Sequence, residues 1–309
     1  MPVSCSQTSQ THLTCEAEAP VRTRLLREVL ELPSNNGDLR AAVRALDDHP
    51  HVKSLADEQH PDGSWGRFHT ADTAARQKIG TTQMGVGRAV ELGLSPDHPI
   101  LTRVRPYLEG ILAGRIAFPD RPEKHDNWPT GIAMFTAATL SRFAAHAPAL
   151  EPTWDFWADV VRRSFAGGAH DLNAELQVHR QRLGRSGAPA WMRLNSMPVL
   201  MILGSRPGRL PEDVQRAYVH WLWNHCPAGL IYADVPLNSS PRTLRGHQID
   251  SYLTSLELLA AFPCCANHRP TRRPALARIA QRTRPMGFRH PTLLPTLLGD
   301  LPQETLPHP

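Results

Sequence analysis

The chain lacks a long hydrophobic run. Although 41% of its 309 residues are apolar, no stretch approaches the roughly 18 consecutive apolar positions that indicate a membrane-spanning helix. The first residues, MPVSCSQ, have neither the basic start nor the apolar centre of a signal peptide. The sequence therefore predicts a protein without a membrane span, and we expect it in the cytoplasm.

Cysteines are few and poorly placed for cross-links. There are five, an odd number, and Cys264 and Cys265 are neighbours. A disulfide framework usually has an even number of separated cysteines, and a cysteine-rich zinc site usually contains a Cys-x-x-Cys pair, which is absent here. Free thiols are therefore expected.

Lysine is almost absent as well, occurring only at Lys53, Lys78 and Lys124. The net charge of +5 and the pI near 9.2 come mainly from arginines that are scattered among acidic residues. No motif for groove reading or base stacking accompanies them. Glycine-rich phosphate loops and Gly-x-Ser-x-Gly turns are also missing. These absences argue against nucleic-acid binding, nucleotide chemistry and serine hydrolysis.

Patterns typical of helices dominate what is present, and strand patterns are nearly absent. Apolar residues recur at helical spacing between joints marked by proline or glycine. The spacing predicts helices over residues 21–32, 39–46, 52–56, 81–92, 100–112, 128–143, 153–165, 171–182, 195–203, 211–225 and 247–262. An all-α fold follows.

A tight turn followed by a large aromatic residue lies at residues 59–68, QHPDGSWGRF. In Pro61-Asp62-Gly63, proline presets φ, aspartate can bond to the backbone two residues on, and glycine accepts a positive φ. Trp65 offers a broad apolar face and one N–H donor, which suits a position between packed helices. We interpret Trp65 as structural.

Mostly apolar helices alternate with amphipathic ones along the chain. The apolar set lies around Met84, Phe135, Leu200 and Leu256, and the amphipathic set around Leu108, Phe156 and Val219. This order favours an α/α toroid, a barrel of paired inner and outer helices, over an irregular helical domain or a solenoid. We expect a disordered leader over residues 1–20, the toroid over 21–263, and a Pro-rich segment over 264–309 that is partly helical or forms a lid.

Four stretches strengthen this interpretation: DGSWGRFH at 62–69, FPDRPEKHDNWP at 118–129, LNS at 194–196 and SLELLAAFP at 255–263. They resemble bacterial prenyltransferase-like or squalene-oxidase-repeat-like proteins, and the turn at 59–68 resembles the QW-type repeat of terpene cyclase and prenyltransferase toroids. The resemblance covers roughly residues 39–263. It implies an α/α toroid related to those enzymes.

The chain departs from both parent chemistries. Class II terpene cyclases use an Asp-x-Asp-Asp motif, and the closest fragment here is Asp47-Asp48 in an expected helix-ending turn. The zinc prenyltransferases use an aspartate, a cysteine and a histidine, and no cysteine lies in the expected leading loops of the apolar helices. A second Gly-x-Trp turn is missing from the last 45 residues. Neither reaction transfers directly.

Polar residues cluster in the loops that lead into the four apolar helices. In a toroid such loops gather around one mouth of the central cavity, so we expect these side chains to converge there. The leading loops contain His69, Asp72, Lys78, Thr81 and Thr82; Asp120, Arg121, His125, Asp126, Asn127 and Trp128; Arg193, Asn195 and Ser196; and Arg245, His247 and Asp250.

His125 and Asp126 are the leading candidates for proton transfer. Histidine titrates nearest neutral pH, and a nearby carboxylate can orient an imidazole or act as an acid when desolvated beside Trp128. The alternative is that Asp126 or Asn127 only caps the following helix. His247 and Asp250 are one helical turn apart, which places both on one face, although such pairs also occur as surface or capping groups.

Further residues are candidates for holding the substrate. The guanidinium of Arg193, with Asn195, suits a carboxylate or phosphate, and the alternative is that Arg193 satisfies backbone carbonyls. His69, Lys78, Arg121, Asn127, Trp128 and Tyr252 complete the predicted substrate-binding set. By analogy with cyclases, Trp128, Phe135 and Tyr252 would shelter a developing positive charge.

The sequence hypothesis is thus a bacterial toroid enzyme that cyclises or isomerises a hydrophobic, prenylated or polyene-like small molecule of natural-product metabolism, with no cofactor predicted. Two alternatives stay open. One is a metal-dependent enzyme in the same cavity, with a divalent or transition metal on His69, His125 and His247. The other is a non-catalytic toroid that binds a lipid or peptide.

Overall fold

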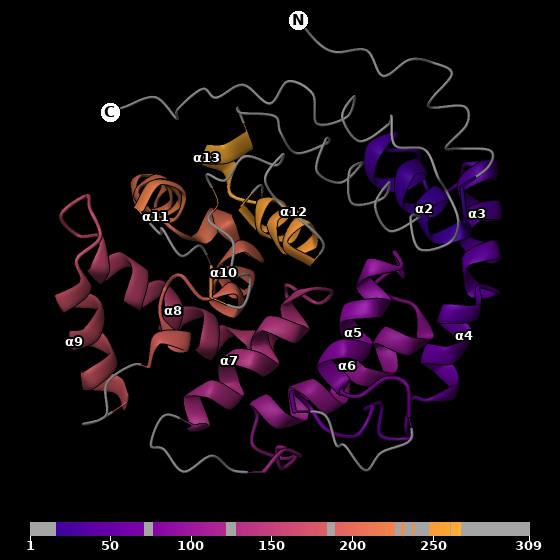
Figure 1. Cartoon of the computed structure of the whole chain (residues 1–309), viewed down its shortest axis with the longest axis horizontal. Coiled ribbons are helices and arrows are strands. Elements are labelled where there is room, and N and C mark those ends of the chain that lie inside the picture. The colour runs from indigo at the N-terminus through magenta and orange to yellow at the C-terminus, as the bar shows by residue number, and fades with distance from the viewer. Residues whose placement is uncertain are drawn as a thin grey trace, which may run out of the picture. The chain divides into compact units, whose positions relative to one another are not determined.

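The computed structural model of the chain describes residues 17–70, 77–121, 128–183, 189–225, 230–231, 237, 247–259 and 261–266. These residues belong to two compact units. The first contains the described residues up to Val104, and the second those from Arg105 onward, so that the boundary falls within one helix, α6. Figure 1 shows the helices of each unit.

Helices dominate both units, which confirms the predicted all-α class. The described residues contain no strand beyond one isolated parallel bridge between Ser196 and Ile231. None of their helices is both long and apolar enough to cross a bilayer. The elements are α2 (Ala19–Arg24), π-helix η1 (Leu25–Val29), α3 (Gly37–Asp47), α4 (Pro50–Asp57), α5 (Thr82–Glu91), α6 (Pro99–Leu112), α7 (Trp128–Ser141), η2 (Pro148–Leu150), α8 (Glu151–Ser164), α9 (Leu172–Leu183), η3 (Ala190–Met192), α10 (Met197–Gly204), η4 (Pro207–Arg209), α11 (Glu212–His225), α12 (His247–Leu259) and α13 (Pro263–Ala266).

Helix ends in the first unit follow capping chemistry. Asn36 Oδ1 accepts hydrogen bonds from the backbone N–H groups of Asp38 and Leu39 at the start of α3. Thr81 Oγ1 does the same for Met84 at the start of α5. After α5, Gly93 adopts a φ of 86°, the left-handed conformation with which helices commonly end.

The turn at residues 59–68 is the central joint of the first unit. The buried Gln59 side chain donates through Nε2 to the carbonyls of Gly63 and Ile100, both at 2.9 Å, and so ties the turn to the start of α6. The Trp65 indole is fully buried, and its Nε1 donates to the Leu55 carbonyl at 3.0 Å. The structural interpretation of Trp65 is therefore confirmed.

Two glycines let this joint close. Gly63 has a φ of 91°, and a Cβ atom there would lie 2.2 Å from the carbonyl oxygen of Arg103. Gly85 on α5 faces the Trp65 ring so closely that a Cβ atom would come within 2.5 Å of indole carbons. The small residues of α5 thus allow the helix backbone to approach the tryptophan.

In the second unit, α7 and α10 pack side by side and run in the same direction. Near the start of α7, Gly131 and Phe135 contact Trp191, which lies just ahead of α10. At the end of α7, Ser141 Oγ lies 3.4 Å from the carbonyl oxygen of Met201, halfway along α10. Arg206, just past the end of α10, likewise reaches the Ala145 carbonyl beyond the end of α7, and this matching order of contacts indicates parallel helices.

Both helices are apolar nearly all round, as expected for helices buried on most faces. Two buried hydroxyls of α7 bond to their own helix: Thr139 Oγ1 donates to the Phe135 carbonyl and Ser141 Oγ to the Ala138 carbonyl. A third, Thr136 Oγ1, has no partner among the described residues. The end of α10 also packs against α12, because Gly204 lies beside the Leu258 carbonyl and the Phe262 ring.

Each of these parallel helices is followed by an amphipathic partner. Helix α8 follows α7, and α11 follows α10; α8 packs against α7, α10 and α11. The buried side of α8 contains Trp154, Trp157 and Val161, and its opposite side is exposed. The second unit thus contains two successive helix pairs, α7–α8 and α10–α11, which we name the two hairpins, and α9 lies between them in the chain.

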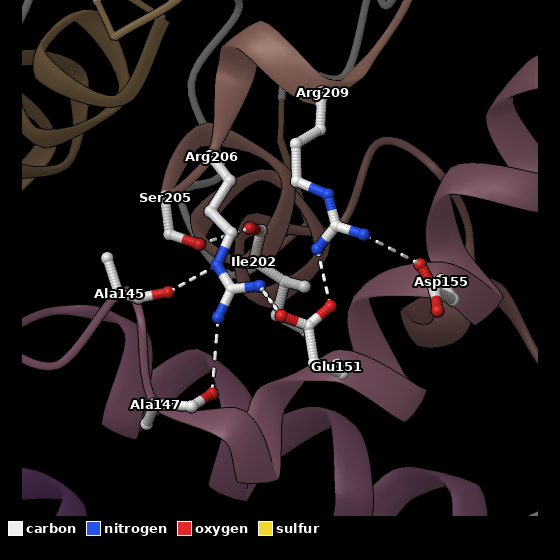
Figure 2. A network of polar contacts seen from close by, with 8 residues as sticks. All are labelled: Ala145, Ala147, Glu151, Asp155, Ile202, Ser205, Arg206 and Arg209. Atoms are coloured by element: carbon white, nitrogen blue, oxygen red, sulfur yellow. Dashed lines mark hydrogen bonds and ion pairs between the residues drawn. The ribbon is translucent and has the colours of Figure 1, made fainter.

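An arginine network joins the tips of the two hairpins (Figure 2). The buried Arg206, at the α10–α11 joint, donates to the carbonyls of Ala145 and Ala147 in the α7–α8 joint and pairs with Glu151 at the start of α8. Arg209 binds the other Glu151 oxygen and Asp155.

The network changes the pKa of its central carboxyl group, that of Glu151. Hydrogen bonds from Arg209 and Arg206 lower the pKa of the Glu151 carboxyl against a smaller opposing effect of burial. The Arg209 guanidinium also lies 4.3 Å above the centre of the Trp154 ring. The contacts fix the spacing of the hairpins at their tips.

We expect Gly85→Ala to lower the free energy of unfolding by about 1–3 kcal/mol, because the added methyl group overpacks a fully buried indole. Gly37→Ala is the matched control, since nothing lies within 4 Å of a Cβ atom there. Urea unfolding followed by circular dichroism measures both variants. Equal stability of the two would contradict the close packing of α5 against Trp65.

Replacement of Arg206 by methionine should cost about 1–3 kcal/mol, because the Ala145 and Ala147 carbonyls lose their donor in a buried joint. The control is Arg216→Met, which removes an exposed pair with Glu212 one helical turn away and should change stability by no more than about 0.5 kcal/mol. Similar urea midpoints for the two variants would show that the tip network does not hold the hairpins.

Candidate functional site

Several predicted site residues fall outside what the structure describes. His125, Asp126 and Asn127 lie in the gap before α7. His247 and Asp250 lie in the first turn of α12, but their side chains are outside the described part. Their proposed catalytic roles therefore stay predictions.

The other predicted residues are divided between the two units. In the first unit, His69 Nδ1 lies 2.7 Å from Gln83 Oε1, and Lys78 is exposed. The remaining ones, in the second unit, are Arg121, Trp128, Arg193, Asn195 and Tyr252. Convergence of all four leading loops on one mouth stays a prediction.

Within the second unit, α7 contacts the segment that leads into α10. Trp128, the first residue of α7, is buried and meets the Phe118 ring edge-on at 5.6 Å between centroids. Further along α7, Phe135 stacks on Trp191 at 5.7 Å. Trp191, in the segment ahead of α10, therefore packs on α7. We name residues 193–196, which follow it, the α10 connector. Arg121 is exposed.

Tyr252 is buried on α12, and this burial raises the pKa of its phenol. Its hydroxyl is therefore protonated over an even wider pH range than an exposed tyrosine.

Side chains from two other helices hold the α10 connector. Glu175 of α9 accepts a hydrogen bond from the Leu194 N–H at 3.0 Å, and the Tyr218 hydroxyl of α11 donates to the Leu194 carbonyl at 2.7 Å. Ile231 pairs with the backbone on either side of Ser196, which gives the isolated bridge. Both polar groups of Leu194 are thus satisfied.

Glu175 is a buried carboxylate with two engaged oxygens. It is 1% exposed, and the oxygen not bound to Leu194 lies 2.7 Å from His170 Nε2. The His170 ring in turn stacks on Trp221 at 4.0 Å between centroids. Leu194 and His170 thus satisfy both oxygens of Glu175, and pairing of this kind is how buried carboxylates are normally compensated.

His179 lies one turn beyond Glu175 on α9 and is fully buried. Its ring sits against Trp157 and Phe156 at 5.6 and 5.9 Å between centroids. Neither ring nitrogen has a hydrogen-bond partner among the described residues. Burial lowers the pKa of this imidazole and Arg193 lowers it further, while Glu175 acts in the opposite direction.

Other buried polar atoms nearby are also without partners in the described part of the chain: Trp157 Nε1, Arg193 Nε and Ser196 Oγ. Most buried polar atoms in native proteins have a hydrogen-bond partner, so a group of unpaired buried atoms requires a physical explanation. We name His170, Glu175, His179 and Arg193 the Glu175 cluster. It combines a buried carboxylate, two imidazoles and a guanidinium beside the α10 connector.

The cluster can hold or move a proton. It is not arranged as a metal site, because no three His, Cys, Asp or Glu side chains converge on one point in the described residues. A neutral imidazole and a carboxylate with engaged oxygens are groups from which acid/base chemistry and pH responses are built.

The sequence interpretation singled out Arg193 but missed His170, Glu175 and His179. The available signal was the spacing Glu175-x-x-Val178-His179, which puts these three side chains on one stripe of α9. The leucines at 172, 176 and 183 recur at helical spacing on another side of α9, so periodicity alone favours burial of that side instead. Burial of the stripe places two titratable groups, Glu175 and His179, in the interior.

No family model, curated protein or solved structure matches this chain.

Glu175→Ala should lower the free energy of unfolding by about 1–3 kcal/mol, because the buried Leu194 N–H loses its acceptor. Glu175→Gln keeps an acceptor oxygen and should lose less. Glu212→Ala, at an exposed position on α11, is the control and should stay near the parent protein. If Glu175→Ala and Glu212→Ala unfold at the same urea concentration, the hydrogen bond between Glu175 and the Leu194 N–H does not contribute to the free energy of unfolding.

Proposed function

We propose that this protein is an α/α-toroid enzyme that cyclises or isomerises a hydrophobic small molecule by proton transfer. The observation that carries the proposal is the parallel packing of two apolar helices, α7 and α10, each followed by an amphipathic partner. Parallel inner helices with outer partners are the repeating order of such toroids. The turn at 59–68, with its buried tryptophan, supports the same architecture.

The character of the accessible positions on these helices supports a hydrophobic ligand. Ile132 and Ala133 on α7, and Met197 and Met201 on α10, keep partial exposure. Met197 and Met201 are four residues apart and therefore lie on one face. Where these helices meet solvent or a ligand they present hydrocarbon and thioether groups, which adapt to flexible apolar molecules.

The start of the parallel helices is where we place the chemistry. His125 and Asp126 come shortly before Trp128 at the start of α7, and Trp191, just ahead of the α10 connector, stacks on Phe135 of the same helix. A substrate that enters there would meet Arg193 and Asn195 at one side and the proposed proton donor at the other. An apolar cavity excludes water and fixes a folded chain, which favours intramolecular ring closure or double-bond shifts.

The test combines binding and turnover. A fluorescent conjugated polyene reports ligand binding, and mass spectrometry of prenyl and polyene compounds reports conversion. His125→Ala and Asp126→Ala should each keep polyene affinity and lose turnover by about 100-fold or more, the usual contribution of a general acid or base. Arg216→Ala, exposed on α11, should change neither.

Each other outcome leads to a different function. Polyene binding without turnover in the parent protein would favour a carrier. A near-stoichiometric transition metal in protein purified without a metal-binding tag would favour a metal enzyme on His69, His125 and His247. Failure to bind any apolar probe would overturn the proposal.

A further inference from the structure

Helix α9 is attached differently from the other helices of the second unit. Its main packing partner is α8, and its buried stripe consists of Glu175, Val178 and His179. Only one of these three side chains is apolar. Beside the stripe, Ala174 and Leu176 are partly buried, so the contact of α9 combines apolar packing with buried polar groups.

The surface that α9 covers also contains unpaired polar groups. His179 is fully buried with both ring nitrogens unpartnered among the described residues, and the adjacent Trp157 Nε1 is in the same condition. An open position of α9 would return all three atoms to water. Closure of α9 over α8 thus buries polar atoms that have no hydrogen-bond partner among the described residues, which weakens this contact relative to an apolar one of equal size.

The groups that face His179 decide how it responds to a proton. On its own helix lies Glu175, from α8 come the uncharged rings of Phe156 and Trp157, and from the α10 connector comes Arg193. Both Glu175 oxygens are already occupied by Leu194 and His170. At the exposed rim, Arg182 pairs with Asp159, and Arg163 with Asp159 and Gln181. A protonated His179 would face the Arg193 guanidinium and two aromatic rings. Both oxygens of the nearby Glu175 carboxylate already contact Leu194 and His170.

Glu175 links the position of α9 to the α10 connector. Its carboxylate receives the Leu194 N–H, so α9 cannot leave α8 without breaking that hydrogen bond. The Leu194 carbonyl would still be bound by Tyr218, but the connector would lose one of its two side-chain anchors. Movement of α9 therefore loosens Arg193 and Asn195.

We propose that α9 is a proton-sensitive latch: it closes over α8 with His179 neutral, and proton uptake by His179 opens it and releases Leu194 from Glu175. The role of the connector as the way to a substrate rests on the proposed function. The latch itself does not, because it depends only on contacts among α8, α9 and the connector.

The direction of the pH response follows from burial. In the closed form the pKa of His179 lies below its ordinary value of 6.5, whereas a solvated ring in the open form titrates near that value. The open form therefore binds more protons as the pH falls below 6.5. The ratio of open to closed molecules should rise by up to about tenfold per pH unit until the closed form also takes up the proton.

Hydrogen exchange of the full chain, read by mass spectrometry, tests the latch. Rates at about pH 7.5 and about pH 5.5 are each divided by the intrinsic rate at that pH, so that only opening is compared. In the parent protein, protection of α9 and of the Leu194 amide should fall by several-fold to about tenfold at the lower pH. The amides of α7, which do not depend on α9, should keep their protection.

Variants at His179 assign the response. His179→Phe puts a ring of similar size without a titrating group between Phe156 and Trp157, and His179→Gln serves if the phenylalanine does not fit. Both should show the same α9 protection at the two pH values. His146→Gln, at an exposed position in the α7–α8 joint, should respond like the parent protein.

Three results would overturn the latch. The first is equal α9 protection at both pH values in the parent protein. The second is an undiminished pH response in both His179 variants. The third is loss of α9 protection while Leu194 stays protected, which would separate α9 from the connector. No substrate enters the experiment, so a failure here differs from a failure of the proposed enzyme activity.

Discussion

The backbone groups at the ends of short helices must find hydrogen-bond partners, and in this protein long polar side chains from elsewhere in the chain supply many of them. Helices of 8 to 14 residues leave a large share of their peptide groups at the ends. Gln59 satisfies two carbonyls in the first unit, Arg206 two in the second, and Glu175 and Tyr218 together hold the polar groups of Leu194. The joints between helices are therefore built from specific donors and acceptors as much as from apolar packing.

This requirement gives the arginines a structural use. Arg24 and Arg27 reach the carbonyls of Glu91 and Gly93 at the end of α5, much as Arg206 reaches the α7–α8 joint. A guanidinium offers five donors on a long stem, so one side chain can satisfy carbonyls and a carboxylate at once. Lysine, with a single ammonium group, would serve such joints less well. Some of the arginines that are scattered through the sequence therefore serve to satisfy carbonyls at the ends of helices.

Much of the fold could be predicted from the sequence, because helical periodicity and capping are local. The predicted helices over 81–92, 100–112 and 211–225 agree with α5, α6 and α11 within a residue or two, and Trp65 is buried as expected. The Glu175 cluster could not be predicted in the same way. Its members come from α9, the loop before it and a connector further along the chain, and their contacts depend on which side of α9 packs on α8. The leucines of α9, Leu172, Leu176 and Leu183, recur at helical spacing on another side of the helix, so the pattern does not indicate the side that is buried.

The two hairpins and α9 illustrate opposite uses of burial in one unit. Helices α7 and α10 bury mainly apolar side chains and contain no ionisable side chain, so their packing does not respond directly to pH. Helix α9 buries a carboxylate and an imidazole, one fully bonded and one unbonded among the described residues, beside a guanidinium. Because the free energy of an unbonded imidazole depends on its proton, the α9 contact can change over a range in which the hairpins stay fixed. A fixed pair of hairpins with a titratable helix between them is the arrangement expected where a stable binding surface must be opened without unfolding its support.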